Sequence, residues 1–116
     1  PVWGGTQRLP RLVGHSFALQ WLLSGQTIDA QTAMQRGLIT RIGDEETFAK
    51  QIAEVVEMAP WALRSVKEAV HKGMDLTLPQ AIQLEADLYS LLQTTEDRKI
   101  GVESFLNKRK APFRGL

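Results

Sequence analysis

The chain has 116 residues, of which 43% are hydrophobic, a formal net charge of +1 and no cysteine. This length suffices for one modest hydrophobic core. The small net charge gives no general attraction for DNA, the lack of cysteine excludes disulfides and thiolate metal sites, and no apolar run approaches the length of a membrane span.

Two adjacent glycines, Gly4 and Gly5, stand near the start, in PVWGGTQRLPRLVG. A glycine pair allows left-handed backbone angles and close approach of other groups. Such turns usually follow a helix or strand. Because no element precedes this pair, we expect the sequence to be a piece of a longer protein. The pair is not a phosphate loop, since it lacks both the P-loop lysine and the dinucleotide-binding glycine spacing.

Residues 15–24, HSFALQWLLS, are apolar on nearly every side of a predicted helix. A helix of this kind must be covered on several faces. A chain this short has little with which to cover it. We therefore expect the helix to pack inside an oligomer or against an absent N-terminal portion of the same protein.

Residues 37–43, GLITRIG, are the one stretch that predicts a β-strand. A single strand cannot pair its own backbone N–H and C=O groups. Its partner strand would therefore lie outside this chain, which is a second indication of a fragment.

Four further helices are predicted after residue 44. The first has an apolar stripe at helical spacing, made of Phe48, Ile52, Val55 and Val56. Pro60 separates it from the second, which Gly73 ends. The third begins at Thr77, with Gln80 placed for a capping box, and Thr94 or Thr95 caps the last.

Side chains that could perform catalysis are sparse. His15 and His71 lie far apart, and neither has a second metal ligand at a suitable spacing. No Gly-x-Ser-x-Gly nucleophile motif occurs. Most carboxylates sit beside a cation on a helix face, as Glu68 does beside Lys72. The residues by themselves therefore predict no catalytic or metal site.

Basic residues gather at the C-terminal end, where six cations accompany the single acid Glu103: Arg98, Lys99, Lys108, Arg109, Lys110 and Arg114. They could simply complement the C-terminal dipole of the last helix. Alternatively, Phe105 one turn before Lys108 suits a ligand that carries both a base and a phosphate. Free nucleotide, RNA and coenzyme A all fit that description.

Three blocks together resemble the C-terminal part of the enoyl-CoA hydratase/isomerase (crotonase) family: GGTQRLPRLVG, LLSGQTIDAQTAMQRGLI and TTEDRKIGVESFLNKRKAPFRG. The resemblance covers nearly the whole chain. It implies a chain that is mainly α as it stands, the C-terminal portion of an α/β fold of ββα turns wound in a spiral. Residues 1–57 would be the tail of that core, with helices and one short strand, and residues 58–116 a helical trimerisation region.

The resemblance also implies a function, namely the C-terminal part of an acyl-CoA-binding lyase, most simply an enoyl-CoA hydratase that adds water to a 2-enoyl-CoA. The catalytic glutamates and the oxyanion hole would lie outside this chain, so no catalytic residue is assigned and the chain alone should be inactive. The alternatives are an isomerase or another crotonase-type reaction, or a non-catalytic helical module for oligomerisation or binding.

The implied partners are an acyl-CoA thioester, the absent N-terminal portion, and further copies in a trimer or a dimer of trimers, with no membrane or DNA. No metal or cofactor is implied, because the coenzyme A thioester is itself the substrate. The implied location is the cytoplasm, or the mitochondrial matrix in a eukaryote.

Four residues match binding positions of the family. Phe105 and Lys108 match a Phe-x-x-Lys that reaches the adenine and 3′-phosphate end of coenzyme A, typically in a neighbouring subunit. Tyr89 matches an aromatic position near the acyl or pantetheine channel. Val2 falls where many members have glycine, next to the catalytic water, so its N–H could hold that water while its side chain narrows the pocket.

Overall fold

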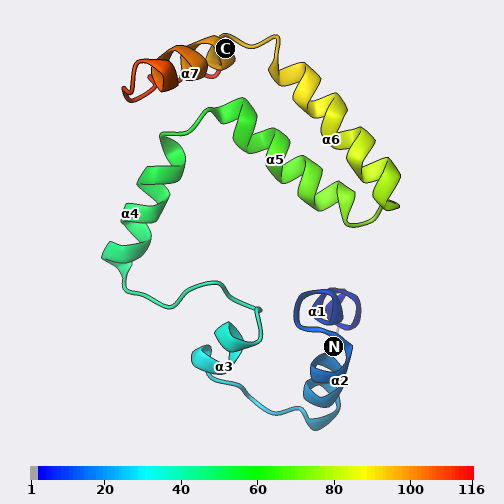
Figure 1. The fold of residues 1–116 in the computed structure, drawn as a ribbon. Helices are drawn as coiled ribbons and strands as arrows, with labels where there is room; N and C mark the ends of the chain where they lie inside the picture. The colour runs from blue at the N-terminus through cyan, green and yellow to red at the C-terminus, as the bar shows by residue number, and fades with distance from the viewer. Residues whose placement is uncertain (1–2) are drawn as a thin grey trace. The chain divides into compact units, whose positions relative to one another are not determined.

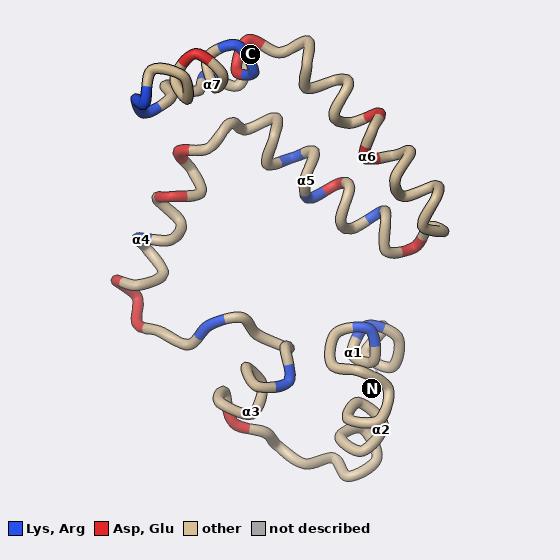
Figure 2. Tube along the Cα trace, in the orientation of Figure 1, with Lys and Arg blue, Asp and Glu red and all other residues tan. Residues whose placement is uncertain are grey.

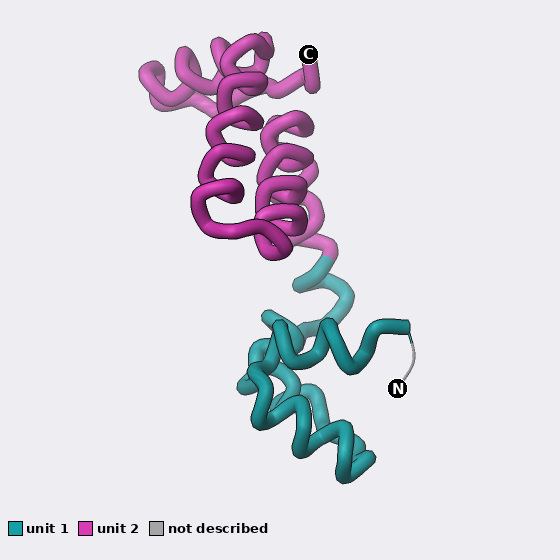
Figure 3. The backbone as a smooth tube through the Cα atoms, turned by 90° about the vertical axis from the view of Figure 1, so that its right-hand side faces the viewer, with its two compact units in different colours: residues 1–48 teal, residues 49–116 magenta. Residues whose placement is uncertain are grey.

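The computed structural model describes residues 3–116, and within that range the chain forms helices and no strand (Figure 1). The helices are α1 (Gly5–Val13), α2 (His15–Ser24), α3 (Ala30–Gln35), α4 (Glu45–Val56), α5 (Pro60–Gly73), α6 (Leu78–Leu92) and α7 (Glu96–Leu106). The chain divides into two compact units, residues 1–48 and 49–116, shown in different colours in Figure 3. The expected boundary between the tail of the core, residues 1–57, and the trimerisation region, residues 58–116, stays a prediction.

The first unit pairs α1 with α2. Helix α1 begins at the glycine pair, with Gly4 at a φ of 82°. Helix α2 confirms the helix predicted over residues 15–24, but the described part of the chain covers it poorly. Ala18 is buried, whereas Leu19 and Leu23 are exposed. The other helices of the first unit do not supply the cover that this apolar helix requires.

The strand predicted over residues 37–43 is wrong. Gly37 has a φ of 75°, and the N–H groups of Gly37 and Leu38 donate to the Met34 and Ala33 carbonyls at 3.0 and 2.9 Å. This pair of bonds is the Schellman turn that ends α3, with glycine at its left-handed position. The backbone donors at the start of the stretch therefore close a helix, and the residues after the turn have no strand partner in the described range.

The second unit contains the α5–α6 hairpin and α7. Pro60 stands at the start of α5, and the Gln80 side chain accepts the Thr77 N–H at 3.1 Å ahead of α6. On α5, Lys72 pairs with Glu68 at 2.6 Å. That hydrogen bond and the Lys72 charge hold the pKa of Glu68 below its ordinary value. The predicted starts of both helices and the predicted ion pair are confirmed.

The hydrophobic core is far smaller than the composition suggests. In the described range only Ala18 and Ala33 are buried hydrophobic residues. The predicted stripe on α4 exists, but its members Ile52 and Val56 are exposed. No helix in residues 3–116 has the length and apolar character needed to cross a bilayer. Most of the apolar surface of this chain is thus left for other chain segments to cover.

Asp44, just before α4, provides a pH-dependent cap. Its Oδ1 accepts the Thr47 hydroxyl at 2.6 Å and the Thr47 N–H at 2.9 Å, and these bonds lower the Asp44 pKa below 3.8. Because the folded pKa is depressed, the cap stabilises the protein above pH 3.8 and is lost as the pH falls through the folded value. We expect Thr47→Val to return the Asp44 midpoint toward 3.8 in a carboxyl ¹³C titration. An unchanged midpoint would contradict this assignment.

Candidate ligand-binding end of helix α7

Helix α7 ends in a tight turn that holds both residues of the predicted Phe-x-x-Lys pair. The Lys108 N–H donates to the Phe105 carbonyl at 3.1 Å, and the Arg109 N–H donates to the Ser104 carbonyl at 2.9 Å. These two bonds form a Schellman turn, with Asn107 as the C-cap and Lys108 at the left-handed position. The sequence-predicted residues Phe105 and Lys108 therefore lie in one turn.

Lys108 adopts a backbone conformation that favours glycine, with a φ of 50°. A side chain in the left-handed region costs about 1 kcal/mol or more, because its Cβ crowds the following carbonyl. The same turn at the end of α3 has Gly37 at the equivalent position. Strained residues of this kind are typical of binding sites. The turn thus has a lysine where glycine would be less strained.

The neighbouring cations are engaged in ion pairs, whereas Lys108 makes none with residues 3–116. Arg109 lies 3.9 Å from Glu103, and Lys110 lies 2.5 Å from Glu57. Figure 2 shows basic residues at both ends of α7. Phe105 is 83% exposed. An exposed ring and a cation that makes no ion pair within residues 3–116 can contact a ligand that has an aromatic base and an anionic group.

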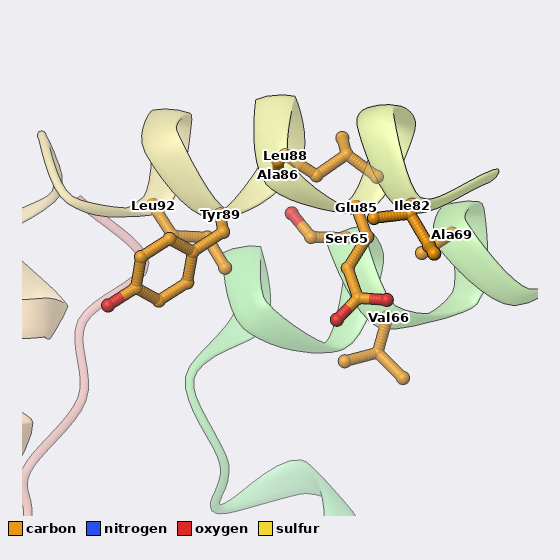
Figure 4. Close-up of a pocket in the computed structure, with 9 residues that line it drawn as sticks. All are labelled: Ser65, Val66, Ala69, Ile82, Glu85, Ala86, Leu88, Tyr89 and Leu92. Atoms are coloured by element: carbon orange, nitrogen blue, oxygen red, sulfur yellow. The ribbon is translucent and has the colours of Figure 1, made fainter. Parts of the chain in front are cut away.

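Tyr89 lies on α6, apart from this turn. It lines an apolar groove of about 540 Å³ between α5 and α6. Figure 4 shows Ile82, Glu85 and Tyr89 along α6 above Ser65 and Val66 of α5. Phe105 and Lys108 are not among the residues that line this groove. The fourth predicted residue, Val2, lies outside the described residues.

The contacts of the C-terminal segment, residues 107–116, could not be predicted from the sequence. This segment returns along α7 to the first turn of the helix. The carboxylate of Asp97 accepts the Arg114 N–H at 2.7 Å and the Gly115 N–H at 2.8 Å. The Leu116 carbonyl accepts the Glu96 N–H at 2.8 Å. On the sequence, Asp97 fits the ordinary acidic first turn of a helix, and nothing in its spacing indicates a bond 17 residues away.

No cluster of three or more His, Asp or Glu residues occurs in the described range that could hold a metal ion. The lowered pKa values of Asp29 and Asp44 have local causes, since each carboxylate accepts hydrogen bonds from a threonine three residues later. Both belong to helix caps. The exposed turn of α7 is accordingly the best candidate site in residues 3–116, and its chemistry is that of binding.

A family model described as enoyl-CoA hydratase/isomerase matches residues 1–115. The chain belongs to the enoyl-CoA hydratase/isomerase family. This match confirms the family resemblance that the sequence showed. The matched residues include the turn at the end of α7.

Individual relatives agree with this assignment. The chain is 39% identical to a 2,3-dehydroadipyl-CoA hydratase of Escherichia coli over 99% of its own length and 47% of the relative's. It is 37% identical to a crotonyl-CoA hydratase of Syntrophomonas wolfei, over 97% of this chain and 45% of the relative's length. The solved enoyl-CoA hydratase of Bacillus anthracis superposes with a TM-score of 0.94 at 33% identity. The match covers 97% of this chain and 45% of the solved one. The chain spans less than half of the length of each of these relatives, and its helices have the fold of the matching part.

Proposed function

We propose that this chain is the C-terminal part of an acyl-CoA-binding lyase, an enoyl-CoA hydratase, and that the turn at the end of α7 binds the nucleotide end of coenzyme A. The observation that supports the reaction is the family match over residues 1–115. The two relatives described above are named as hydratases of CoA thioesters. Water would be added to a 2-enoyl-CoA.

The chemistry requires groups beyond this chain. Negative charge develops on the thioester oxygen as water adds, and preorganised N–H donors stabilise it. A carboxylate must also activate the water and another must return a proton to carbon. Asp29 and Asp44 form helix caps, Glu68 forms an ion pair, and Asp97 binds residues 114 and 115. No carboxylate of the chain matches a catalytic position of the family, so we assign the glutamates and the oxyanion hole to a portion of the protein outside residues 1–116.

The reaction is tested with the full-length protein and with residues 1–116 alone. We expect the full-length protein to hydrate crotonyl-CoA, followed as the loss of the ultraviolet absorbance of the conjugated thioester. The 116-residue chain should give no turnover, because it contains no catalytic glutamate. Turnover by the chain that persists through further purification would contradict the assignment of the catalytic groups. Inactivity of the full-length protein on all short 2-enoyl-CoA thioesters would contradict the hydratase.

Binding is assigned to Phe105 and Lys108. The adenine would lie against the exposed ring of Phe105, and the 3′-phosphate would pair with Lys108. This proposal is supported by the left-handed backbone of Lys108 and by the absence of an ion pair for it in residues 3–116. Mere complementation of the helix dipole would not explain the choice of lysine there, because Arg109 and Lys110 already supply positive charge at the same helix end.

Tyr89, Val2 and the assembly complete the proposal. Tyr89 is 63% exposed on α6, as expected for a side chain that another segment or a pantetheine chain covers in the whole protein. Val2 would lie beside the catalytic water. Residues 58–116 would form the contacts of a trimer, since their apolar side chains are left uncovered within the described range.

A further inference from the structure

The C-terminal segment is held at both of its ends, at the Schellman turn where it leaves α7 and at Asp97 where it finishes. Asp97 is 4% exposed, and its two oxygens accept the consecutive N–H groups of Arg114 and Gly115. Two amide bonds to one buried carboxylate are charge-assisted and orient the segment strongly. Between these ends the segment has no helix or strand, so the two fixed ends determine its path.

Further contacts hold the end of the segment near Asp97. The indole Nε1–H of Trp61 donates to the Gly115 carbonyl at 3.0 Å. A Cβ placed on Gly101 would lie 3.4 Å from the ring of Phe113, so the segment contacts the side of α7 closely. Asp97 thus anchors the end of the C-terminal segment, a strap formed by residues 107–116.

This strap has a consequence for Lys108. A residue in a strained conformation persists only where the surrounding structure enforces it. The turn by itself holds Lys108 in this conformation only weakly. The free-energy cost of a lysine at the left-handed position is about as large as the contribution of one hydrogen bond of the turn. We infer that Asp97 is a positioning residue, which keeps Lys108 left-handed by anchoring the strap, and so presents its ammonium group to the coenzyme A 3′-phosphate. The ligand part of this inference rests on the proposed function.

The test is Asp97→Asn in the full-length protein. The variant keeps the size of the side chain but turns an NH₂ group toward one of the two amides. We expect coenzyme A to bind about tenfold more weakly, while dephospho-coenzyme A, which lacks the 3′-phosphate, binds almost as before. The Arg109 amide, which closes the Schellman turn, should exchange with deuterium at least about tenfold faster.

Glu96→Gln is the matched control. Glu96 lies in the same helical turn and also complements the helix dipole, but its side chain makes no bond to the strap. We expect this variant to bind both ligands as the unmodified protein does. If Asp97→Asn lowers the melting temperature yet leaves the ratio of the two affinities and the Arg109 exchange unchanged, the positioning role is wrong and Asp97 serves stability alone.

Two further measurements decide the positioning role if Asp97→Asn does not fold or if the phosphate assignment fails. If Asp97→Asn does not fold, removal of residues 113–116 takes away the two N–H groups bound to Asp97, together with the other contacts of the segment's end, and leaves the sequence of α7 unchanged. The same two measurements then apply. If the unmodified protein binds both ligands equally, the phosphate assignment fails. In that case the Arg109 exchange still decides the positioning role, since faster exchange in Asp97→Asn supports it and equal exchange overturns it.

Discussion

Lys108→Gly is expected to stabilise the end of α7 and, at the same time, to weaken binding of coenzyme A. Glycine removes the strain of the left-handed position, worth about 1 kcal/mol of unfolding free energy. The loss of a charge-assisted phosphate contact costs about 1 to 3 kcal/mol, or roughly five- to a hundred-fold in affinity. The affinity for dephospho-coenzyme A should change little, because this ligand lacks the 3′-phosphate. Calorimetric titration with both ligands and a thermal melt of the full-length protein measure the two effects.

Three variants isolate the causes. Lys108→Ala removes the cation but keeps the strain, so it should lose the phosphate contact without gaining stability. Lys108→Arg keeps the cation and should retain most of the preference for coenzyme A. Gly37→Lys places lysine in the equivalent turn of α3 and should destabilise the protein by about 1 kcal/mol. Equal losses for both ligands in Lys108→Ala would end the phosphate assignment.

Phe105 and added salt give independent checks on the same site. Phe105→Ala should weaken coenzyme A and dephospho-coenzyme A alike, because both ligands keep the adenine. The effect of Lys108→Ala should shrink as salt is added, since an exposed charge pair is screened. A salt-independent loss would indicate that the substitution acts through the fold and not through a phosphate.

Most helices could be predicted from the sequence because their signals are local. Thr77 with Gln80, Thr95 with the Arg98 N–H, and Pro60 at the start of α5 all act within four residues. The pairing of Phe105 with Lys108 has the same origin, since both lie in one helical turn. The left-handed backbone of Lys108 could not be predicted, because the lysine there departs from the usual preference for glycine.

Two features escaped prediction. Residues 37–43 have the composition of a strand, but a strand exists only with a partner, and Gly37 instead closes α3. The bonds of Asp97 join residues 17 and 18 positions apart, and no periodicity encodes them. The apolar surface of α2 was recognised from the sequence, and the rest of the first unit leaves Leu19 and Leu23 exposed.

The exposed apolar surface of the second unit leads to a prediction about assembly. Val66 and Ile82 line the α5–α6 groove and are 60% and 58% exposed. Large apolar patches on one chain mark surfaces that other segments cover. Residues 1–116 alone should therefore be oligomeric or lack a cooperative melt. A compact monomer with a sharp melting transition, seen by sedimentation and calorimetry, would contradict this expectation.

In the full-length protein, Val66→Glu is expected to dissociate the oligomer. Burial of a valine side chain contributes about 1.5 to 3 kcal/mol, and a buried unpaired carboxylate adds a further cost. The dissociation constant should therefore rise more than tenfold, measured by sedimentation over a range of concentrations. Lys67→Glu is the matched control, because it introduces the same carboxylate at the next, exposed position of α5 without removing apolar area. If Val66→Glu assembles as the unmodified protein does, the groove is no subunit interface. If it unfolds the protein without a folded, dissociated species, the groove is covered by the same chain, and the trimer contacts must lie elsewhere.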